Sequence, residues 1–510
     1  MTEPDPKADA AREAAAIGNV VLVTAYRGMG LVLTIGLVMF QAAAFGTTLA
    51  ADAFAFARQT ISATLSQLEH LLEKVFVPVF MQDATADESS TAARLMRLAL
   101  QLVLLSIVAT AMLWLAVPAI VSALAPTFEG ERRDITITVF RIMLLGIPPS
   151  VLAGLFAAAR FSRRKFGLVS LARLMPRAAG LLGFVFAGLS LSVTGLSWWL
   201  VGGMAAMAAA LFYATMRVSL RGKPLSVEPG QASEGSGRRA VATVIGAVGQ
   251  IALGSINAFL ATFGPVGTIT LMFLGLRLLN AAPGMTGTAV NTVYFAEFAE
   301  GAQNRRTDQA RRIASGLRMS LMFALPIAAL LVVAAGPIAE LLLVRGAFSE
   351  ADGLAVAEFV VLMTPTLLVN ASHSAFSPAV LADPELPLAR VTTIGSVAAI
   401  AVRLGLGLVL VPRYGLDGLA VAILISSLAN NLALWVVLRR AYGRLMSLRD
   451  FGVLARMAAA AILGAAIPWA LPGVPILLTA PASGVAYVAL CFLFNVPEIR
   501  ILLRRRKTAV

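Results

Sequence analysis

The feature that most constrains the fold is a series of apolar runs, each about 20 residues long, separated by short polar segments. A helix of about this length spans the hydrocarbon core of a bilayer and satisfies its own backbone hydrogen bonds there. Hydrophobic residues make up 59% of the 510-residue chain, and charged residues make up only 13%. The sequence therefore predicts an all-α, polytopic membrane protein.

We place about 14 helices across the membrane. Their expected residues are 19–44, 51–80, 94–124, 136–159, 166–190, 194–218, 240–263, 266–298, 309–344, 352–381, 387–411, 416–438, 451–471 and 474–495. The second span is the least hydrophobic, so much of its surface must face protein or water.

The longest interior polar stretch, 219–239, divides the chain into two series of spans. We expect it to be a cytoplasmic linker between two pseudo-symmetric six-helix lobes, an N-lobe at 19–218 and a C-lobe at 240–438. Two C-terminal helices at 439–495 then follow the lobes.

Lys and Arg cluster in alternate polar segments, and such clusters mark the cytoplasmic side. With the N-terminus inside, the cytoplasmic clusters lie at 160–165, 217–239, 305–312, 439–449 and 500–507. The opposite loops are poor in basic residues, with Arg132 and Arg133 among the exceptions. We expect a cytoplasmic tail at 1–18 without a removable signal peptide, a basic cytoplasmic tail at 496–510 and both termini inside.

Several classes of function are excluded or disfavoured. The net charge of +14 is spread over loops rather than one face, and no soluble domain could form a nucleic-acid groove, so no nucleic-acid partner is expected. A Gly-rich phosphate loop is absent, which excludes ATP hydrolysis by this chain. Two histidines and one cysteine provide no metal cluster, and no deep span holds paired acids or an activated nucleophile. We expect that the protein binds neither a cofactor nor a metal and that it is not an enzyme.

One cation lies deep in the eighth expected span. Arg277 belongs to the apolar run 269–280, and no carboxylate occurs between Glu234 and Glu297. An ionisable residue at membrane depth costs several kcal/mol, so Arg277 is expected to face an interior cavity or an anion. We expect the substrate to supply the negative charge.

The first and second spans carry further charges, Arg27, Asp52 and Arg58. If the first, second and eighth spans line one cavity, the three arginines make a cationic pocket with Asp52 as a local counter-ion. Arginine donates bidentate hydrogen bonds to phosphate and keeps its proton, so a diphosphate is a natural ligand. The alternative is that Arg27 and Arg58 reach the membrane interfaces and Asp52 caps a helix start.

Two acids lie one turn apart later in the second span. Glu69 and Glu73 are each followed by a basic residue, His70 and Lys74 respectively. Local pairing along the helix is therefore expected, with gating between the lobes as the alternative.

The remaining charges within spans favour structural roles. Arg173 and Arg177 are expected to reach the inner membrane interface. A cavity role and a structural role are both open for Arg403. His373 is expected to be a core histidine with a hydrogen-bond partner.

Short motifs along the chain resemble the MviN/MurJ group of lipid II flippases, in the MOP exporter superfamily. The segments that carry the resemblance are Ala44-Phe-Gly-Thr-Thr-Leu-Ala-Ala-Asp-Ala-Phe54, Phe76-Val-Pro78, Arg277-Leu-Leu-Asn-Ala-Ala-Pro-Gly284, Arg345-Gly-Ala-Phe-Ser-Glu-Ala-Asp352 and Arg413-Tyr-Gly-Leu-Asp-Gly-Leu-Ala420. Their order, spacing and span count agree over nearly the whole chain.

The resemblance implies a V-shaped, two-lobed flippase of the bacterial cytoplasmic membrane with a cationic central cavity. Arginines on the first, second and eighth spans would bind the substrate diphosphate, and the last two spans, 439–495, would form a groove for the polyprenyl tail. Arg277 matches the eighth-span arginine, Asp52 the acid that opens the second span, and Glu69 a later acid. The implied partners are a lipid-linked oligosaccharide, membrane lipids and an envelope-synthesis complex.

The sequence also departs from the family pattern. The first span keeps Arg27 but lacks the second arginine and its following Asp, and 62–68 lacks the second-span arginine, which Arg58 would have to replace. A flippase for an exopolysaccharide or O-antigen precursor is therefore an alternative, as are a cation-coupled drug exporter and a non-transporting scaffold. Residues 240–263 contain no carboxylate, so no sodium site of the kind some members have is expected there. Membrane potential or a proton could drive the cycle.

Overall fold

The computed structural model describes residues 6–82, 88–163, 165–218, 249, 251–281, 306–383, 386, 388–471 and 473–499. The chain divides into two compact units, Met1–Ala247 and Val248–Val510. The expected linker at 219–239 lies outside the described residues. Throughout the described ranges the secondary structure is helical, without strands, as the all-α prediction requires.

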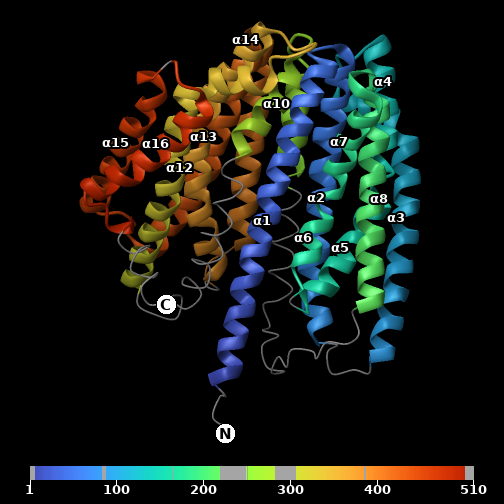
Figure 1. Cartoon of the computed structure of the whole chain (residues 1–510), viewed down its shortest axis with the longest axis horizontal. Coiled ribbons are helices and arrows are strands. Elements are labelled where there is room, and N and C mark those ends of the chain that lie inside the picture. Colours follow the sequence, from blue (N-terminus) through green and yellow to red (C-terminus); the bar gives the residue numbers. More distant parts are fainter. Residues whose placement is uncertain are drawn as a thin grey trace. The chain divides into compact units, whose positions relative to one another are not determined.

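The first unit begins with three long helices and continues with shorter ones (Figure 1). Its helices are α1 (Pro6–Phe45), α2 (Leu49–Gln82), α3 (Glu88–Leu124), α4 (Gly130–Leu144), α5 (Ile147–Phe161), α6 (Gly167–Ala172), α7 (Met175–Ala187), η2 (Gly188–Ser190) and α8 (Val193–Val218). Helix α1 begins at Pro6, within the expected tail at 1–18, so residues 6–18 are helical. Helix α2 packs against α4 and α5, and α5 and α7 pack against α8.

The second unit contains the remaining described helices. They are an apolar helix at Ile251–Ala261, α10 (Thr268–Ala281), α12 (Arg306–Leu343), α13 (Glu350–Ala382), α14 (Leu388–Tyr442), α15 (Leu448–Ala470) and α16 (Ile476–Leu493). Helix α13 packs against α10, α12 and α14, while α15 and α16 pack against each other and against α12 (Figure 1).

The described helices follow the expected spans, but the seventh (240–263) and the eighth (266–298) lie only partly within the described residues. Prolines account for the differences in the first unit. The fourth expected span is two helices, α4 and α5, because Pro148 and Pro149 lack the N–H groups that would continue α4. The fifth is divided into α6 and α7 ahead of Pro176. The eleventh and twelfth expected spans are the two helices that make up α14, which are separated at a kink where Gly415 adopts φ 54°.

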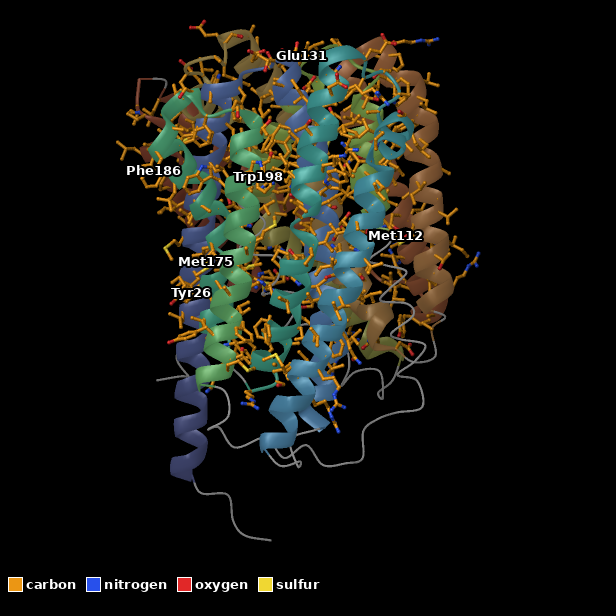
Figure 2. The ribbon with its side chains drawn as sticks, turned by 90° about the vertical axis from the view of Figure 1, so that its right-hand side faces the viewer. Tyr26, Met112, Glu131, Met175, Phe186 and Trp198 are labelled. Carbon is orange, nitrogen blue, oxygen red and sulfur yellow. The ribbon has the colours of Figure 1, made fainter. Side chains whose placement is uncertain are left out.

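Within the described residues, ten helical segments are long and apolar enough to cross a membrane, and two of them, Gly130–Phe161 and Gly167–Ser190, combine α4 with α5 and α6 with α7. Their outer faces are apolar, as a lipid-facing surface requires. In the first unit, Met112 is 67% exposed and Phe186 75% exposed, and both point away from the helix bundle (Figure 2). Large apolar side chains at this exposure are placed in hydrocarbon rather than water.

One close helix contact positions α10, the helix that carries Arg277. A Cβ atom built on Gly275 would lie 2.5 Å from Cδ1 of Phe359 on α13, and Phe359 is fully buried. Successive helical residues are rotated by about 100°, so Arg277 lies on the opposite side of α10 from this contact. Glycine at 275 therefore allows the approach of α10 to α13 and directs Arg277 away from it.

We expect Gly275→Ala to destabilise the second unit by about 1–3 kcal/mol, because the buried Phe359 ring has to move to admit the methyl group. Thermal unfolding in detergent measures the effect. Gly405→Ala is the matched control, since nothing lies within 4 Å of its added Cβ and alanine favours a helix interior. Phe359→Leu should restore stability to Gly275→Ala; equal melting temperatures for both glycine variants would contradict the expectation.

Candidate functional site

The first turn of α2 holds a buried ion pair. Asp52 is completely buried, and its Oδ2 accepts a hydrogen bond from Nη2 of Arg132 on α4 at 2.6 Å. The Arg132 guanidinium also stacks 3.8 Å from the centroid of the Phe128 ring. Thr48 caps the helix start by accepting from the Ala51 amide at 3.2 Å. The carboxylate of Asp52 thus joins α2 to α4, and the capping role belongs to Thr48.

Arg132 was expected in a loop between the third and fourth spans, because it lies in a charged segment between two apolar runs. Instead it lies in the first turn of α4 and is 8% exposed. Figure 2 shows its neighbour Glu131 at the end of the unit where α4 begins, with Tyr26 of α1 toward the opposite end. The ion pair therefore lies close to one end of the helices of the first unit.

Arg58 lies on α2, almost two turns beyond Asp52. Its side chain is buried, and its guanidinium lies 5.6 Å from the centroid of the Phe54 ring. Arg27 lies on α1 with an exposed side chain. Arg277 belongs to the second unit, so the convergence of Arg27, Arg58 and Arg277 on one cavity stays a prediction.

The acids later in α2 find partners in other helices. Glu73 forms an ion pair with Arg173, the residue between α6 and α7, and also contacts Nδ1 of His70 at 3.3 Å. Glu69 interacts electrostatically with Arg173 and Arg177. Local pairing therefore exists for His70 and Glu73, and Arg173 connects α2 to the segment between α6 and α7. The expected reach of Arg173 and Arg177 to the inner membrane interface stays a prediction.

A glycine allows this close arrangement. A Cβ atom on Gly154 of α5 would lie 3.1 Å from Cα of Glu69 and 3.2 Å from its carbonyl oxygen. Helix α5 thus packs on the backbone of α2 at the level of the acid. The side chain of Glu69 is held at a fixed depth between these helices.

Arg277 lies in the third turn of α10, half-buried, with its guanidinium 4.9 Å from the centroid of the buried Phe273 ring. Stacking on an aromatic face favours a guanidinium and orients its plane. Helix α10 packs against α13 and α14, so Arg277 has a well-defined backbone position. The segment after Ala281, with the Pro-Gly pair of the family motif, lies outside the described residues.

Arg403, for which two roles were open, has structural partners. It is 5% exposed, and its Nε donates to Oγ of Ser426 at 2.8 Å while Nη1 donates to Oδ1 of Asn257 at 3.0 Å. These contacts join the two halves of α14 to the helix at Ile251–Ala261. His373, on α13, is half-buried and lies near Asn431 of α14, so its expected role as a core histidine stays a prediction.

An apolar groove of about 960 Å³ lies among α12, α13, α14 and α15. Leu325, Phe376, Leu428, Trp435 and Leu454 are among the side chains that line it. The polar atoms of Ser372 and Asn431 are exceptions in an otherwise hydrocarbon wall. A groove of this chemistry suits an extended apolar chain.

The arrangement of helices is similar to the fold of solved membrane transporters. A solved lipid II flippase MurJ in an inward closed conformation matches with a TM-score of 0.75 and 15% identity, over 95% of this chain and 100% of its own. An inward-facing multidrug resistance MATE family transporter of the MOP superfamily matches with a TM-score of 0.64 and 13% identity, over 83% of this chain and 98% of its own. At these identities the similarity concerns the fold alone.

The sequence identifies the family. The family model described as lipid II flippase MurJ matches residues 41–497, and the chain belongs to this family. A probable lipid II flippase MurJ of Rhizobium meliloti is 29% identical over 233 residues. That match covers 44% of this chain and 42% of the relative, so it spans less than half of the relative's length. Family and apolar helices together indicate a multi-pass inner-membrane protein.

Proposed function

We propose that this protein is a flippase that moves lipid II, a polyprenyl-diphosphate-linked saccharide, across the cytoplasmic membrane by alternating access. The observation that carries the proposal is the family match over residues 41–497, which includes every helix from the end of α1 to α16. Both termini would lie in the cytoplasm, as the distribution of Lys and Arg favours. Membrane lipids and the envelope-synthesis machinery would be its surroundings.

The charged head of such a substrate needs cations, and its tail needs hydrocarbon. Arg277 would bind the diphosphate together with Arg27 and Arg58, since a guanidinium donates two parallel hydrogen bonds to phosphate. The polyprenyl tail would occupy the groove among α12, α13, α14 and α15. Helix α15 belongs to the C-terminal pair for which the family resemblance implies this role.

Arg277→Ala is expected to weaken binding of lipid II about 10-fold to 100-fold, because a charge-assisted hydrogen bond to phosphate is lost. The affinity of Arg277→Lys for lipid II should lie between those of the parent chain and Arg277→Ala, since lysine keeps the charge but not the two parallel N–H donors. Binding and translocation of fluorescent lipid II in proteoliposomes measure the effect, and complementation of a flippase-depleted strain extends it to cells. Arg413→Ala, which removes an exposed arginine of the same unit, is the control. Unchanged binding and complementation in Arg277→Ala would refute the role of Arg277.

A second substrate is favoured by one specific observation. The first span keeps a single arginine, and 62–68 lacks the arginine of the family's second span. A cavity with fewer guanidinium groups suits another lipid-linked oligosaccharide, such as an exopolysaccharide or O-antigen precursor. If the same proteoliposomes translocate such a precursor but not lipid II, the second substrate is the correct one.

A further inference from the structure

Helix α12 contains a gap in its own hydrogen bonding. Pro326 lies inside the helix, between Arg306 and Leu343. Proline has no N–H group, so the carbonyl of Met322, four residues earlier, lacks its usual donor within the helix. In hydrocarbon an unsatisfied carbonyl costs several kcal/mol, so such a gap is closed by another group or becomes a point of bending.

A side chain from α16 closes this gap. The hydroxyl of Tyr487 donates to the Met322 carbonyl oxygen at 2.8 Å, and Tyr487 is 6% exposed. A glycine on α15 permits the placement, because a Cβ atom on Gly464 would lie 3.0 Å from the Ser483 carbonyl oxygen and 3.3 Å from the Tyr487 nitrogen. The C-terminal helical pair thus supplies the donor that Pro326 removes.

One turn before Met322, the same pair is fixed to α12 by charge. Arg318 forms ion pairs with Asp450, in the first turn of α15, and with Glu498, which follows α16. Asp450 also completes a capping box with Ser447 at the start of α15. The part of α12 before the proline is therefore anchored to α15 and α16 independently of Tyr487.

Space for movement lies directly beside the proline. A cavity of about 430 Å³ among α12, α15 and α16 is lined by Pro326, Ile327, Leu330, Ala461, Val488 and their neighbours. Close packing normally leaves no void of this size beside a helix. The part of α12 that follows the proline, 327–343, has room to bend toward this cavity.

We propose that Pro326 is a hinge in α12 and that Tyr487 locks it. With the hydroxyl on the Met322 carbonyl, α12 keeps its present course. When the hydroxyl leaves, 327–343 bends toward the cavity while the ion pairs of Arg318 hold the first half. Tyr487 is thus a positioning residue, through which α15 and α16 control the bending of α12. The link to transport rests on the proposed function, whereas the hinge itself does not.

The experiment is a double-mutant cycle with Tyr487→Phe and Pro326→Ala in the full chain. Spin labels at Leu341→Cys on α12 and Trp469→Cys on α15, both exposed positions, report the bending as a distance distribution in proteoliposomes without substrate. The chain's own cysteine, Cys491, is fully buried and stays unlabelled. Tyr414→Phe, which removes the same atom from an exposed tyrosine, is the matched control.

Tyr487→Phe is expected to raise the bent fraction about three-fold, the change that corresponds to a typical hydrogen bond between membrane helices. Pro326→Ala restores the missing N–H, so in that background Tyr487→Phe should change nothing, and the coupling isolates the hinge. An equal effect of Tyr487→Phe in both backgrounds, or none in either, would overturn the lock.

Translocation of fluorescent lipid II is measured on the same samples. The Pro326→Ala variant lacks the hinge in α12, so it is expected to translocate lipid II at least three-fold more slowly than the parent chain. If Pro326→Ala translocates lipid II at the rate of the parent chain, the hinge has no role in the transport cycle. A parent chain that bends as expected but translocates no lipid-linked saccharide would instead overturn the proposed function and leave the lock intact.

Discussion

Replacing Arg132 with alanine is expected to destabilise the first unit by about 3–5 kcal/mol, because it leaves Asp52 with a completely buried carboxylate that has lost its ion-pair partner. The loss should exceed that of any exposed arginine, since surface pairs contribute about 1 kcal/mol or less. Thermal unfolding of the purified protein in detergent measures it. Arg133→Ala, which removes the neighbouring half-buried arginine and its hydrogen bond to Oγ of Ser122, is the control.

A double variant separates stability from substrate binding at the same pair. Asp52→Leu together with Arg132→Met replaces the ions with apolar side chains, and such replacement commonly restores most of the stability. We expect translocation to recover with stability, because Asp52 then acts only by joining α2 to α4. Recovered stability without translocation would place Asp52 at the substrate, and a melting temperature of Arg132→Ala equal to that of the control would contradict the ion-pair argument itself.

Arg318→Ala is the second change with a large expected effect. It removes the shared partner of Asp450 and Glu498, and the side chain of Glu498 is only 2% exposed. Leaving two acids close together without this cation is expected to cost about 3–5 kcal/mol. The cost should fall on the attachment of α15 and α16 to α12 rather than on the whole unit.

Limited proteolysis therefore measures this effect better than global unfolding does. The connection between α14 and α15, around Gly443, should be cut faster in Arg318→Ala than in the parent chain. Arg413→Ala controls for loss of an arginine, and Glu498→Gln, which keeps a hydrogen-bonding group, should lie in between. Cleavage of Arg318→Ala at the parent rate would refute the anchoring of the helical pair by this residue.

The all-helical, membrane-spanning character of the chain was predictable from local sequence. Apolar runs of the right length specify helices, because lipid offers the backbone no other hydrogen-bond partner. The breaks were less visible: Pro148 and Pro149 divide an apolar run that reads as one span, and hydropathy does not register a missing N–H. The interruption expected between the eleventh and twelfth spans was visible in the sequence, and the two helices meet there at the kink of Gly415.

The partners of the charged residues were not predictable in the same way. Arg318 lies inside the expected ninth span, so its depth was a signal that a partner exists, yet its acids lie more than a hundred residues later in the chain. Arg173 pairs with Glu73 of α2, a hundred residues earlier in the chain. Local spacing identifies pairs within one helix, whereas these pairs join helices.

The sequence by itself determined the all-helical membrane fold, the order of the spans and the family motifs, because each of these depends on residues close together along the chain. Only the tertiary structure decided which charges hold helices together. Asp52 with Arg132, Arg403 with Asn257 and Ser426, and Tyr487 with the Met322 carbonyl all join segments that are distant in sequence. The physical reason is that a polar group in a dry interior takes whichever partner packing brings within hydrogen-bond distance, and packing depends on the whole unit.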